Sequence, residues 1–388
     1  MATEKKKGSF EGVILGMGNP LLDITAPVEM SYLEKYDLQL DSAILAEPSH
    51  MAIYKELSEM PEVKYVAGGA TLNSIRVAGW MVSEGWGKVA YFGSIGEDDY
   101  GSKLEECASA DGVFTSFHRS SKNPTGTCAA LIHKAERSLV ANLAAANDFS
   151  ISHVEKEDNW KVVEKAQVMY CAGFFLTVCV DSLVKVRLCD IDCCILHILL
   201  LLHRHLTPTT STNFNKLQQT QVAAHAAATN KVFCLNFSAP FIIDFFAEQL
   251  KRALPYADYI FANESEAAAY GKANGIGDEG KDIEAVALAV SSHPKENGSR
   301  GRVVVFTQGD KETIVAKNGV ITKYAVTPLA KELLIDTNGA GDAFVGGFLA
   351  GLSKNLPIEK CVEAGHWASK FIIQKSGTEL TDKCDFKF

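Results

Sequence analysis

Short apolar and β-branched runs recur along the chain, and most of them close on a small or polar residue. Helix-length stretches such as residues 75–84, 242–254 and 283–291 lie between several of these runs. A strand followed by a helix, repeated, predicts βαβ units and therefore an α/β fold with a mostly parallel central sheet flanked by helices. The runs are GVILGMGNP, KVAYFGSIG, VMYCAGFF, KVFCLNFS, ADYIFANE and RVVVFTQG.

The carboxyl ends of these predicted strands are where we expect a ligand to bind, because parallel sheets open a crevice at that edge. Glycines allow a ligand to approach the backbone closely, and an asparagine amide can both donate and accept hydrogen bonds. The residues that would lie at this edge are Asn19, Gly93, Asn236, Asn263 and Gly309.

A second pattern interrupts the first, because four stretches look like short strands without intervening helices. They are residues 23–28, 42–47, 126–132 and 138–143. We expect them to form a small sheet that covers one edge of the larger domain as a lid, since excluding water favours transfer reactions. The expected lid comprises residues 21–64 and 119–145, and the expected large α/β domain comprises residues 8–20, 65–118 and 146–388.

Composition excludes several classes of protein. Of 388 residues, 47% are hydrophobic and 22% charged, as in an ordinary soluble globular protein. The net charge of −9 argues against nucleic acid or an anionic membrane as the main partner. The ten cysteines include no CxxC pair and no zinc-type spacing. Since the N-terminus also lacks the apolar core of a signal peptide, we expect a cytoplasmic protein.

The stretch DTNGAGDAF, residues 336–344, precedes a long apolar run. One interpretation is a tight turn that leads into a buried helix, with glycines where the chain bends sharply. The other is an anion-binding site, in which Gly339, Ala340 and Gly341 present N–H groups at a helix N-terminus beside the carboxylate of Asp342.

Other motifs also allow two interpretations each. GMGNPLLD lacks the third glycine of a dinucleotide fingerprint, and no Walker-type loop is present. Asp23 could bind a polyol or be a turn residue, and Asn73 in AGGATLNS could bind a ligand or follow a helix N-cap. In NESE, Asn263 and Glu266 share one face of a helical turn, where they could orient waters around Mg²⁺ or cap the helix. FTQGD closes a strand in the manner of a nucleotide-contacting loop.

Taken together and in chain order, GMGNPLLD, AGGATLNS, NESE and DTNGAGDAFVGGF resemble the ribokinase-like family of carbohydrate and nucleoside kinases. ILAE, NPTGTCAA, ERSLVANLAAAN, AGFFLTV and NFSAPFI are further similar to the adenosine-phosphorylating branch of that family. The resemblance extends from about Gly12 to Phe386. Separated stretches in one order are far more specific than any single motif.

The resemblance implies a ribokinase-like fold and ATP-dependent phosphorylation of adenosine at its 5′-hydroxyl, giving AMP and ADP, in purine salvage. It implies Mg²⁺ with ATP as co-substrate, adenosine and ATP as partners, no nucleic acid or membrane partner, and a monomer. Two alternatives stay open: a kinase for another nucleoside or a sugar, and a non-catalytic adenosine-binding protein. A substrate panel separates the first alternative, and binding without turnover identifies the second.

The same resemblance assigns roles to individual residues. Asp342 is the expected base, the backbone of Gly339, Ala340 and Gly341 holds the phosphate, and Arg137 reaches in from the lid. For the nucleoside the resemblance implies Asn19, Asp23, Gly69, Asn73, Cys128, Leu139, Ala141, Phe174 and Phe241. For ATP it implies Asn263, Gln308, Gly309, Asn338 and His366, and for Mg²⁺ it implies Glu266 with Asn263 through water.

The chain departs from the family pattern in two places. Leu72 stands where the family usually has glutamine, which removes one polar group beside Asn73. About 36 extra residues, 187–222, separate two helix-like stretches that would otherwise join. We interpret them as a translated intron or a wrongly assigned exon rather than a genuine insertion. They would break a helix and expose residues 195–202, an apolar and aggregation-prone patch.

Overall fold

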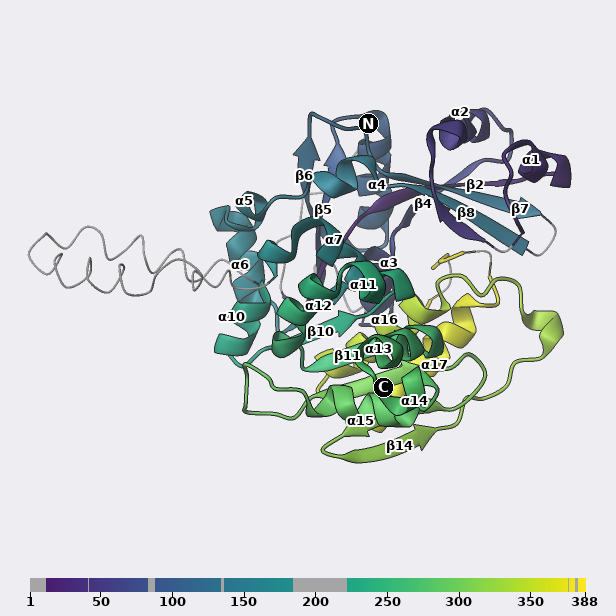
Figure 1. Ribbon diagram of the computed structural model, residues 1–388. Coiled ribbons are helices and arrows are strands. Elements are labelled where there is room, and N and C mark those ends of the chain that lie inside the picture. The colour runs from purple at the N-terminus through teal and green to yellow at the C-terminus, as the bar shows by residue number, and fades with distance from the viewer. Residues whose placement is uncertain are drawn as a thin grey trace, which may run out of the picture.

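The computed structural model describes residues 12–40, 42–82, 88–133, 136–183, 222–375, 377–380 and 383–388. These residues form two β-sheets with their helices (Figure 1). Among the helices that the structure describes, none has both the length and the apolar character that crossing a bilayer requires.

The larger sheet has nine strands in the order β14-β13-β12-β11-β10-β9-β1-β5-β6. All neighbours from β12 to β6 pair in parallel, and β13 and β14 add an antiparallel edge. The predicted α/β fold is therefore confirmed. The strands are β1 (Ile14–Met17), β5 (Val89–Gly96), β6 (Val113–Ser120), β9 (Val168–Ala172), β10 (Val232–Asn236), β11 (Tyr259–Asn263), β12 (Val303–Thr307), β13 (Thr313–Lys317) and β14 (Val320–Tyr324).

Helices cover both faces of this sheet, as alternate residues of β10 show. Phe233 and Leu235 pack into one hydrophobic cluster, and Cys234 packs into the other. The first cluster involves α5 (Ile151–Val154), α6 (Glu157–Lys165), α7 (Leu176–Cys179), α10 (Val222–Ala228), α11 (Pro240–Phe245), α12 (Ala247–Ala253), α13 (Glu264–Asn274) and α15 (Ile283–Ser292), with α14 (Gly277–Gly280) beside it. The second involves α3 (Ala70–Val82), α4 (Asp99–Ala110), α16 (Ala340–Ser353) and α17 (Ile358–Ile372). Short 3₁₀ turns lie at Pro48–His50, Ala144–Asp148, Gly173–Phe175, Val180–Ser182, Leu254–Tyr256 and Lys331–Leu333.

The smaller sheet has five strands in the order β3-β8-β7-β2-β4. Its strands are β2 (Leu21–Pro27), β3 (Ala43–Leu45), β4 (Lys64–Gly68), β7 (Thr127–His133) and β8 (Glu136–Asn142). The four strands predicted for a small sheet are confirmed, but β4 was not predicted, and the expected boundary after residue 64 falls inside it. The helices α1 (Met30–Lys35) and α2 (Met51–Ser58) cover one face of this sheet.

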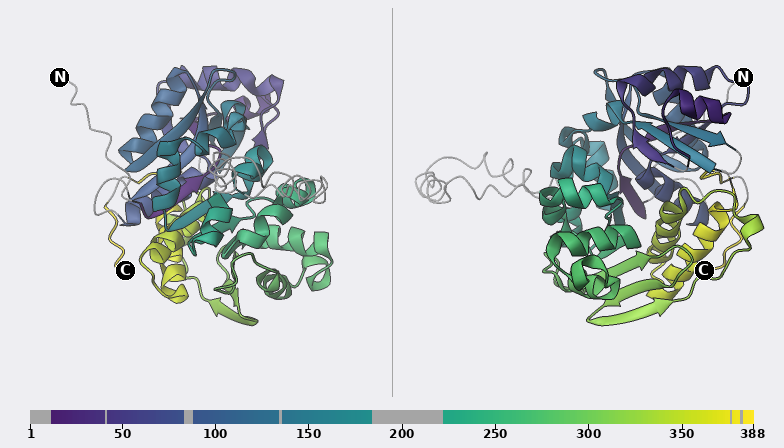
Figure 2. Two further views of the ribbon diagram at one scale, coloured as in Figure 1. Left: turned by 90° about the vertical axis from the view of Figure 1, so that its left-hand side faces the viewer. Right: turned by 45° about the vertical axis from the view of Figure 1, so that its right-hand side comes forward.

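The other face of the smaller sheet turns toward the large domain. Along β2, Ile24 and Ala26 pack against α1 and α2, whereas Asp23 and Thr25 line a cavity together with Thr378 from the C-terminal end of the chain. The right-hand view of Figure 2 shows the yellow C-terminal segment directly below the small sheet. We propose that each sheet with its helices is one domain and that the smaller one is the lid.

The predicted insertion, residues 187–222, lies outside the described residues except for Val222. Its two flanks nevertheless meet, because the amide of Ala223 donates a hydrogen bond of 2.9 Å to the carbonyl of Leu183, and both residues are buried. Without 36 intervening residues, Ala223 would be the fourth residue after Leu183, which is the spacing of an α-helical hydrogen bond. We propose that the segment interrupts one helix without changing its register.

Deleting residues 187–222 is therefore expected to leave the melting temperature unchanged or raise it. The joined chain keeps a valine before Ala223, because residues 186 and 222 are both valine. A control deletion of residues 189–222 keeps two more residues and rotates the following helix by about 200°, which turns Ala223 and Ala226 out of the core. Thermal unfolding of the three chains by circular dichroism tests this. Equal stability of the two deletions would contradict a retained register.

Candidate active site

The sequence DTNGAGD forms a turn that leads directly into α16. Gly339 is the N-cap residue with φ 75°, a left-handed conformation that favours glycine, and its carbonyl accepts the first helical hydrogen bond from Ala343 at 2.8 Å. The side chain of Asp336 accepts a hydrogen bond from the amide of Asn338 at 2.8 Å, which holds the turn in place. The tight-turn interpretation is thus confirmed. The first amides of α16 carry the partial positive charge of a helix N-terminus.

A cavity of about 340 Å³ opens in front of this helix terminus. Asn236, Asn263 and Thr307, which end β10, β11 and β12, all line it. Asn236 and Asn263 thus lie at carboxyl ends of strands, as predicted. The cavity brings together these residues expected from the sequence: Phe174, Asn263, Glu266, Asn338, Gly339, Gly341 and Asp342. Ala340 lies at the first helical position, where its carbonyl accepts a hydrogen bond from Ser369.

Asp342 has a strongly perturbed carboxyl group. The pKa of this carboxyl is raised to about 7, and burial is the largest cause. The hydrogen bond from Asn73 lowers the pKa, and the carboxylates of Asp23 and Glu266 contribute to raising it. Asn73 Nδ2 donates to Asp342 Oδ2 at 3.0 Å, so α3 and α16 hold the two side chains together. A carboxylate that titrates near neutral pH is suited to accept a proton from a bound hydroxyl.

Arg76 fixes the orientation of the Asn73 amide, and it was not predicted. Its side chain is 3% exposed and donates to the carbonyls of Ala67 and Thr378 and, at 3.3 Å, to Asn73 Oδ1. The amide oxygen of Asn73 therefore faces Arg76, and its NH₂ group faces Asp342. The spacing of three residues between Asn73 and Arg76 on one helix could have revealed this pair.

Arg137 extends from β8 to the turn before α16. Its Nη1 lies 2.9 Å from Asp336 Oδ2, and its Nη2 donates to Thr25 Oγ1 at 3.3 Å. Both side chains of the ion pair are 8% exposed, so the pair is held out of bulk water. Arg137 also lines a second cavity of about 560 Å³, between the smaller sheet and residues 377–379, together with Asp23 and Thr378. The structure thus places this arginine of the small sheet against Asp336, in the turn before α16.

The residues expected around a nucleoside come from both the small sheet and the parts of the chain around the large sheet. Burial raises the pKa of Asp23 to about 6, although Arg137 and Arg76 lower it. Asn19 Nδ2 donates to the carbonyl of Phe174 at 3.3 Å, and the rings of Phe174 and Phe241 lie 5.9 Å apart. Gly69 has φ 97° and lies so close to the Asn19 carbonyl that a Cβ would be 2.3 Å from it. Cys128, Leu139 and Ala141 belong to one small apolar cluster.

Ser238 was not predicted, although it lines the same cavity as Asp342. It is a non-glycine residue with φ 70°, a left-handed conformation that stores backbone strain. The side chain of Asn236 accepts a hydrogen bond from the Ser238 amide at 3.0 Å, and Ser238 Oγ accepts one from the Gly173 amide at 2.8 Å. This network fixes the loop after β10 beside Phe174.

Asn263 and Glu266 form a capping box at the start of α13. Asn263 Oδ1 accepts from the Glu266 amide at 2.8 Å, and Glu266 Oε2 accepts from the Asn263 amide at 3.1 Å. The helix-cap interpretation is therefore confirmed. Burial raises the pKa of Glu266 to about 7. Within the described ranges, no group of three or more His, Cys, Asp or Glu side chains could hold a metal ion.

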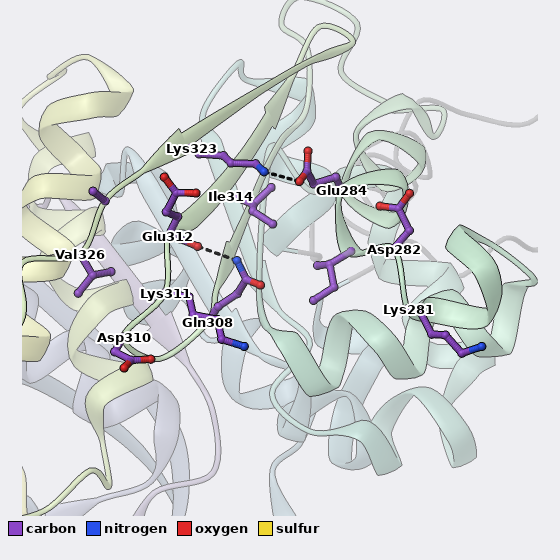
Figure 3. Close-up of a pocket in the computed structure, with 12 residues that line it drawn as sticks. Lys281, Asp282, Glu284, Gln308, Asp310, Lys311, Glu312, Ile314, Lys323 and Val326 are labelled. Carbon is purple, nitrogen blue, oxygen red and sulfur yellow. Dashed lines mark hydrogen bonds and ion pairs between the residues drawn. The ribbon is translucent and has the colours of Figure 1, made fainter.

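The expected ATP residues are not all brought together. Gln308 lines a third cavity of about 560 Å³, where its Nε2 donates to the Glu312 carbonyl at 2.7 Å (Figure 3). Gly309 follows Gln308 with φ 60°. His366 instead contacts Thr313 Oγ1 at 2.8 Å and the ring of Phe344, and it is absent from the linings of the three cavities.

Leu72, the departure from the family pattern, does not line any of the three described cavities. Its side chain is fully buried on α3, in the hydrophobic cluster that contains Ile14 and Ala67. A glutamine at this position would have to bury its amide, so the leucine fits its surroundings.

The sequence matches a known family over most of its length. The model of the pfkB family carbohydrate kinases matches residues 30–190 and 209–383. Adenosine kinase 1 of Arabidopsis thaliana is 45% identical over 377 residues, which cover 97% of this chain and 98% of that relative. The adenosine kinase of Dictyostelium discoideum is 42% identical, covering 95% of this chain and 96% of its own.

Solved structures show the same likeness. Anopheles gambiae adenosine kinase in complex with P1,P4-di(adenosine-5) tetraphosphate superposes with a TM-score of 0.79 at 39% identity, covering 97% of this chain and 99% of that one. Schistosoma mansoni adenosine kinase in complex with adenosine and AMP superposes with a TM-score of 0.78 at 32% identity, with the same two coverages.

Proposed function

Because the chain belongs to the pfkB family of carbohydrate kinases, we propose that it transfers the γ-phosphoryl group of ATP to the 5′-hydroxyl of adenosine, giving AMP and ADP. One observation of the site supports this activity most directly. The half-buried side chain of Asp342, oriented by Asn73, lies in the first turn of α16 and lines a cavity at the carboxyl ends of the strands. A base and a helix N-terminus side by side suit a hydroxyl that attacks a phosphoryl group.

In this proposal Asp342 accepts the proton of the 5′-hydroxyl as the oxygen attacks the γ-phosphorus. The amides of Gly339 and Gly341 hold the phosphoryl oxygens, and that of Ala340 joins them when it releases the Thr337 carbonyl, to which it donates at 3.2 Å. A helix terminus contributes about 0.3–1 kcal/mol at exposed sites and up to about 2 kcal/mol when partly buried, which is too little alone. The guanidinium of Arg137 therefore adds positive charge from the lid.

The nucleoside would lie between the two domains. Asp23 and Asn73 would bind the ribose hydroxyls, with Asn19 and the close backbone of Gly69 beside them. Phe174 and Phe241 offer aromatic faces to the purine, since their rings are neighbours. The apolar side of the pocket would consist of Cys128, Leu139 and Ala141 from the lid sheet.

The nucleotide would extend from the α16 terminus toward β12. We assign Asn263 and Asn338 to the phosphates and Gln308 and Gly309 to the adenine side, and we place His366 behind them, against Phe344. Glu266 uses one carboxylate oxygen in the helix cap and borders the cavity, which fits Mg²⁺ held through water. When bound, Mg²⁺ supplies charge neutralisation on the phosphates. We further propose a monomer that acts in purine salvage in the cytoplasm.

The value of kcat/KM for adenosine is expected to fall as the pH decreases through about 7 and to level off above it. Burial raises the pKa of Asp342 to about 7, and only the deprotonated carboxylate can accept the hydroxyl proton. Initial rates at saturating Mg·ATP from about pH 5.5 to 9 measure this. An apparent pKa near that of an exposed aspartate, or a rate that rises on acidification, would exclude Asp342 as the base.

A substrate panel tests the proposed specificity. The protein is incubated with Mg·ATP and adenosine, inosine, guanosine, cytidine or ribose, and nucleotide products are separated by chromatography. We expect AMP and ADP in equal amounts with adenosine and little turnover of the others. Faster phosphorylation of another nucleoside or of ribose would show that the chain is a different kinase of the family.

A further inference from the structure

Residues 377–379, close to the C-terminus, contact the turn before α16, Arg76 on α3 and the small sheet, although no sequence motif marks them. The amide of Gly377 donates to Asp336 Oδ2 at 3.0 Å. The carbonyl of Thr378 accepts from Arg76 Nη2 at 3.0 Å. Glu379 forms an ion pair of 3.4 Å with Lys64, which belongs to β4 of the small sheet. We call Gly377–Glu379 the clasp.

The clasp is packed against the catalytic turn and the lid arginine with little free space. Gly377 has φ 75°, and a Cβ on it would lie 2.5 Å from Arg137 Nη1. Gly339 caps α16, and a Cβ there would lie 2.8 Å from Thr378 Oγ1. The short segment therefore fills the space between the lid cation and the start of α16.

Two series of polar contacts meet at the clasp. The first extends from Arg137 through Asp336 to the Gly377 amide. The second leads from the Thr378 carbonyl through Arg76 and Asn73 to Asp342, as follows from the contacts described above. Because Gly377 and Thr378 are adjacent residues, a displacement of one series of contacts displaces the other.

Residues before and after the clasp in the sequence hold it in place. On one side, the end of α17 holds the turn before α16, because the amides of Ile335 and Asp336 donate to the Ile373 carbonyl. On the other side, Leu380 and Phe386 pack into the cluster of Trp80, Trp367 and Phe371, where the rings of Phe386 and Trp367 are 5.5 Å apart. The packing of these aromatic rings thus holds in place the part of the chain that follows the clasp.

We propose that the clasp is a positioning element for phosphoryl transfer: it holds Arg137 on Asp336 and, through Arg76 and Asn73, holds Asp342 in place. None of its residues needs to touch substrate. The inference rests on the proposed function, because that function gives Arg137 and Asp342 their roles. It goes further by making the C-terminal segment, far from every motif, a requirement for turnover.

The test compares two glycine-to-alanine variants with the same backbone strain. Gly377→Ala adds a methyl group against Arg137, whereas Gly319→Ala adds one at the β13–β14 turn, where φ is also 75° and nothing lies within 4 Å of the new atom. We expect Gly377→Ala to lower kcat at least about tenfold, with the Kd of adenosine within about threefold, because a small misplacement of the reacting groups is costly. Gly319→Ala is expected to keep the parent kcat. Equal kcat values for the two variants would overturn the proposal.

A double-mutant cycle distinguishes positioning from a general loss of structure. In an Arg137→Ala background the clash with Arg137 is gone, so adding Gly377→Ala is expected to change kcat by no more than about twofold. A further tenfold loss in that background would overturn the proposal. The double variant also carries the test if Gly377→Ala alone does not fold. Activity of the parent enzyme on adenosine is measured in the same series, so failure of the proposed function is seen separately.

Discussion

Replacing Asp342 by asparagine is expected to lower kcat for adenosine phosphorylation by at least about 10²-fold while changing the Kd of adenosine by no more than about threefold. Asparagine keeps the size of the side chain and an oxygen that can accept from Asn73 Nδ2, but it cannot take up the proton of the 5′-hydroxyl. General base catalysis typically contributes about 10²–10⁴-fold, and binding is left intact. Steady-state rates and calorimetric titration with adenosine measure the two quantities.

The fold of this variant should be intact, and its melting temperature equal to or above that of the parent. Burial disfavours the charged form of Asp342, and the neutral amide removes that penalty at neutral pH. A matched control is Asp99→Asn, because Asp99 is also an aspartate in the first turn of a helix, α4, but is exposed. Near-parent turnover in Asp342→Asn, or an equal loss in Asp99→Asn, would remove Asp342 from the role of base.

Replacing Arg137 by alanine is expected to lower kcat at least about 10²-fold and to destabilise the fold. A positioned arginine that stabilises phosphoryl-transfer charge is worth about 10³–10⁵-fold in other enzymes, and the helix terminus of α16 compensates for part of its loss. The substitution also leaves Asp336 buried without its cation, which typically costs about 3–5 kcal/mol. The amides of Gly377 and Asn338 still donate to Asp336, so we expect the lower end of that range.

An exposed ion pair gives the control for charge loss. Arg252 and Asp181 form a pair of 2.6 Å with side chains 40% and 53% exposed, so Arg252→Ala should cost no more than about 1 kcal/mol and leave kcat unchanged. Denaturant titration and initial rates compare the two variants. If kcat of Arg137→Ala stays within about threefold of the parent, Arg137 does not act on the phosphoryl group, whatever its effect on stability.

The fold could be predicted because the spacing of apolar residues that distinguishes strands from helices is visible within short stretches of the sequence. Runs such as RVVVFT are apolar on both faces, as buried parallel strands require, and β12 is indeed buried at all but its last residue. Strand β4 was missed for a local reason. Lys64–Gly68 is short, ends on glycine and continues at once into α3, so its sequence looks like the approach to a helix.

The central site residues could be predicted where a motif groups them. Asp342, Asn263 and Glu266 come from such motifs, and all three line one cavity. The contact between Arg76 and Thr378 could not be predicted in this way, because it joins residues 302 positions apart and involves a backbone carbonyl. A carbonyl carries no side-chain signature in a sequence, so positioning elements of this kind emerge only from the structure.

Whether the protein phosphorylates bound adenosine or only binds it is the most direct test of the proposed function. The full-length protein is mixed with adenosine, Mg²⁺ and ATP labelled at the γ-phosphoryl group, and the label is followed in single-turnover conditions with enzyme in excess over adenosine. The account predicts that the label moves to AMP and that one ADP forms for each AMP. Adenosine that binds the protein while the label stays in ATP would contradict it and identify the chain as a non-catalytic adenosine-binding protein.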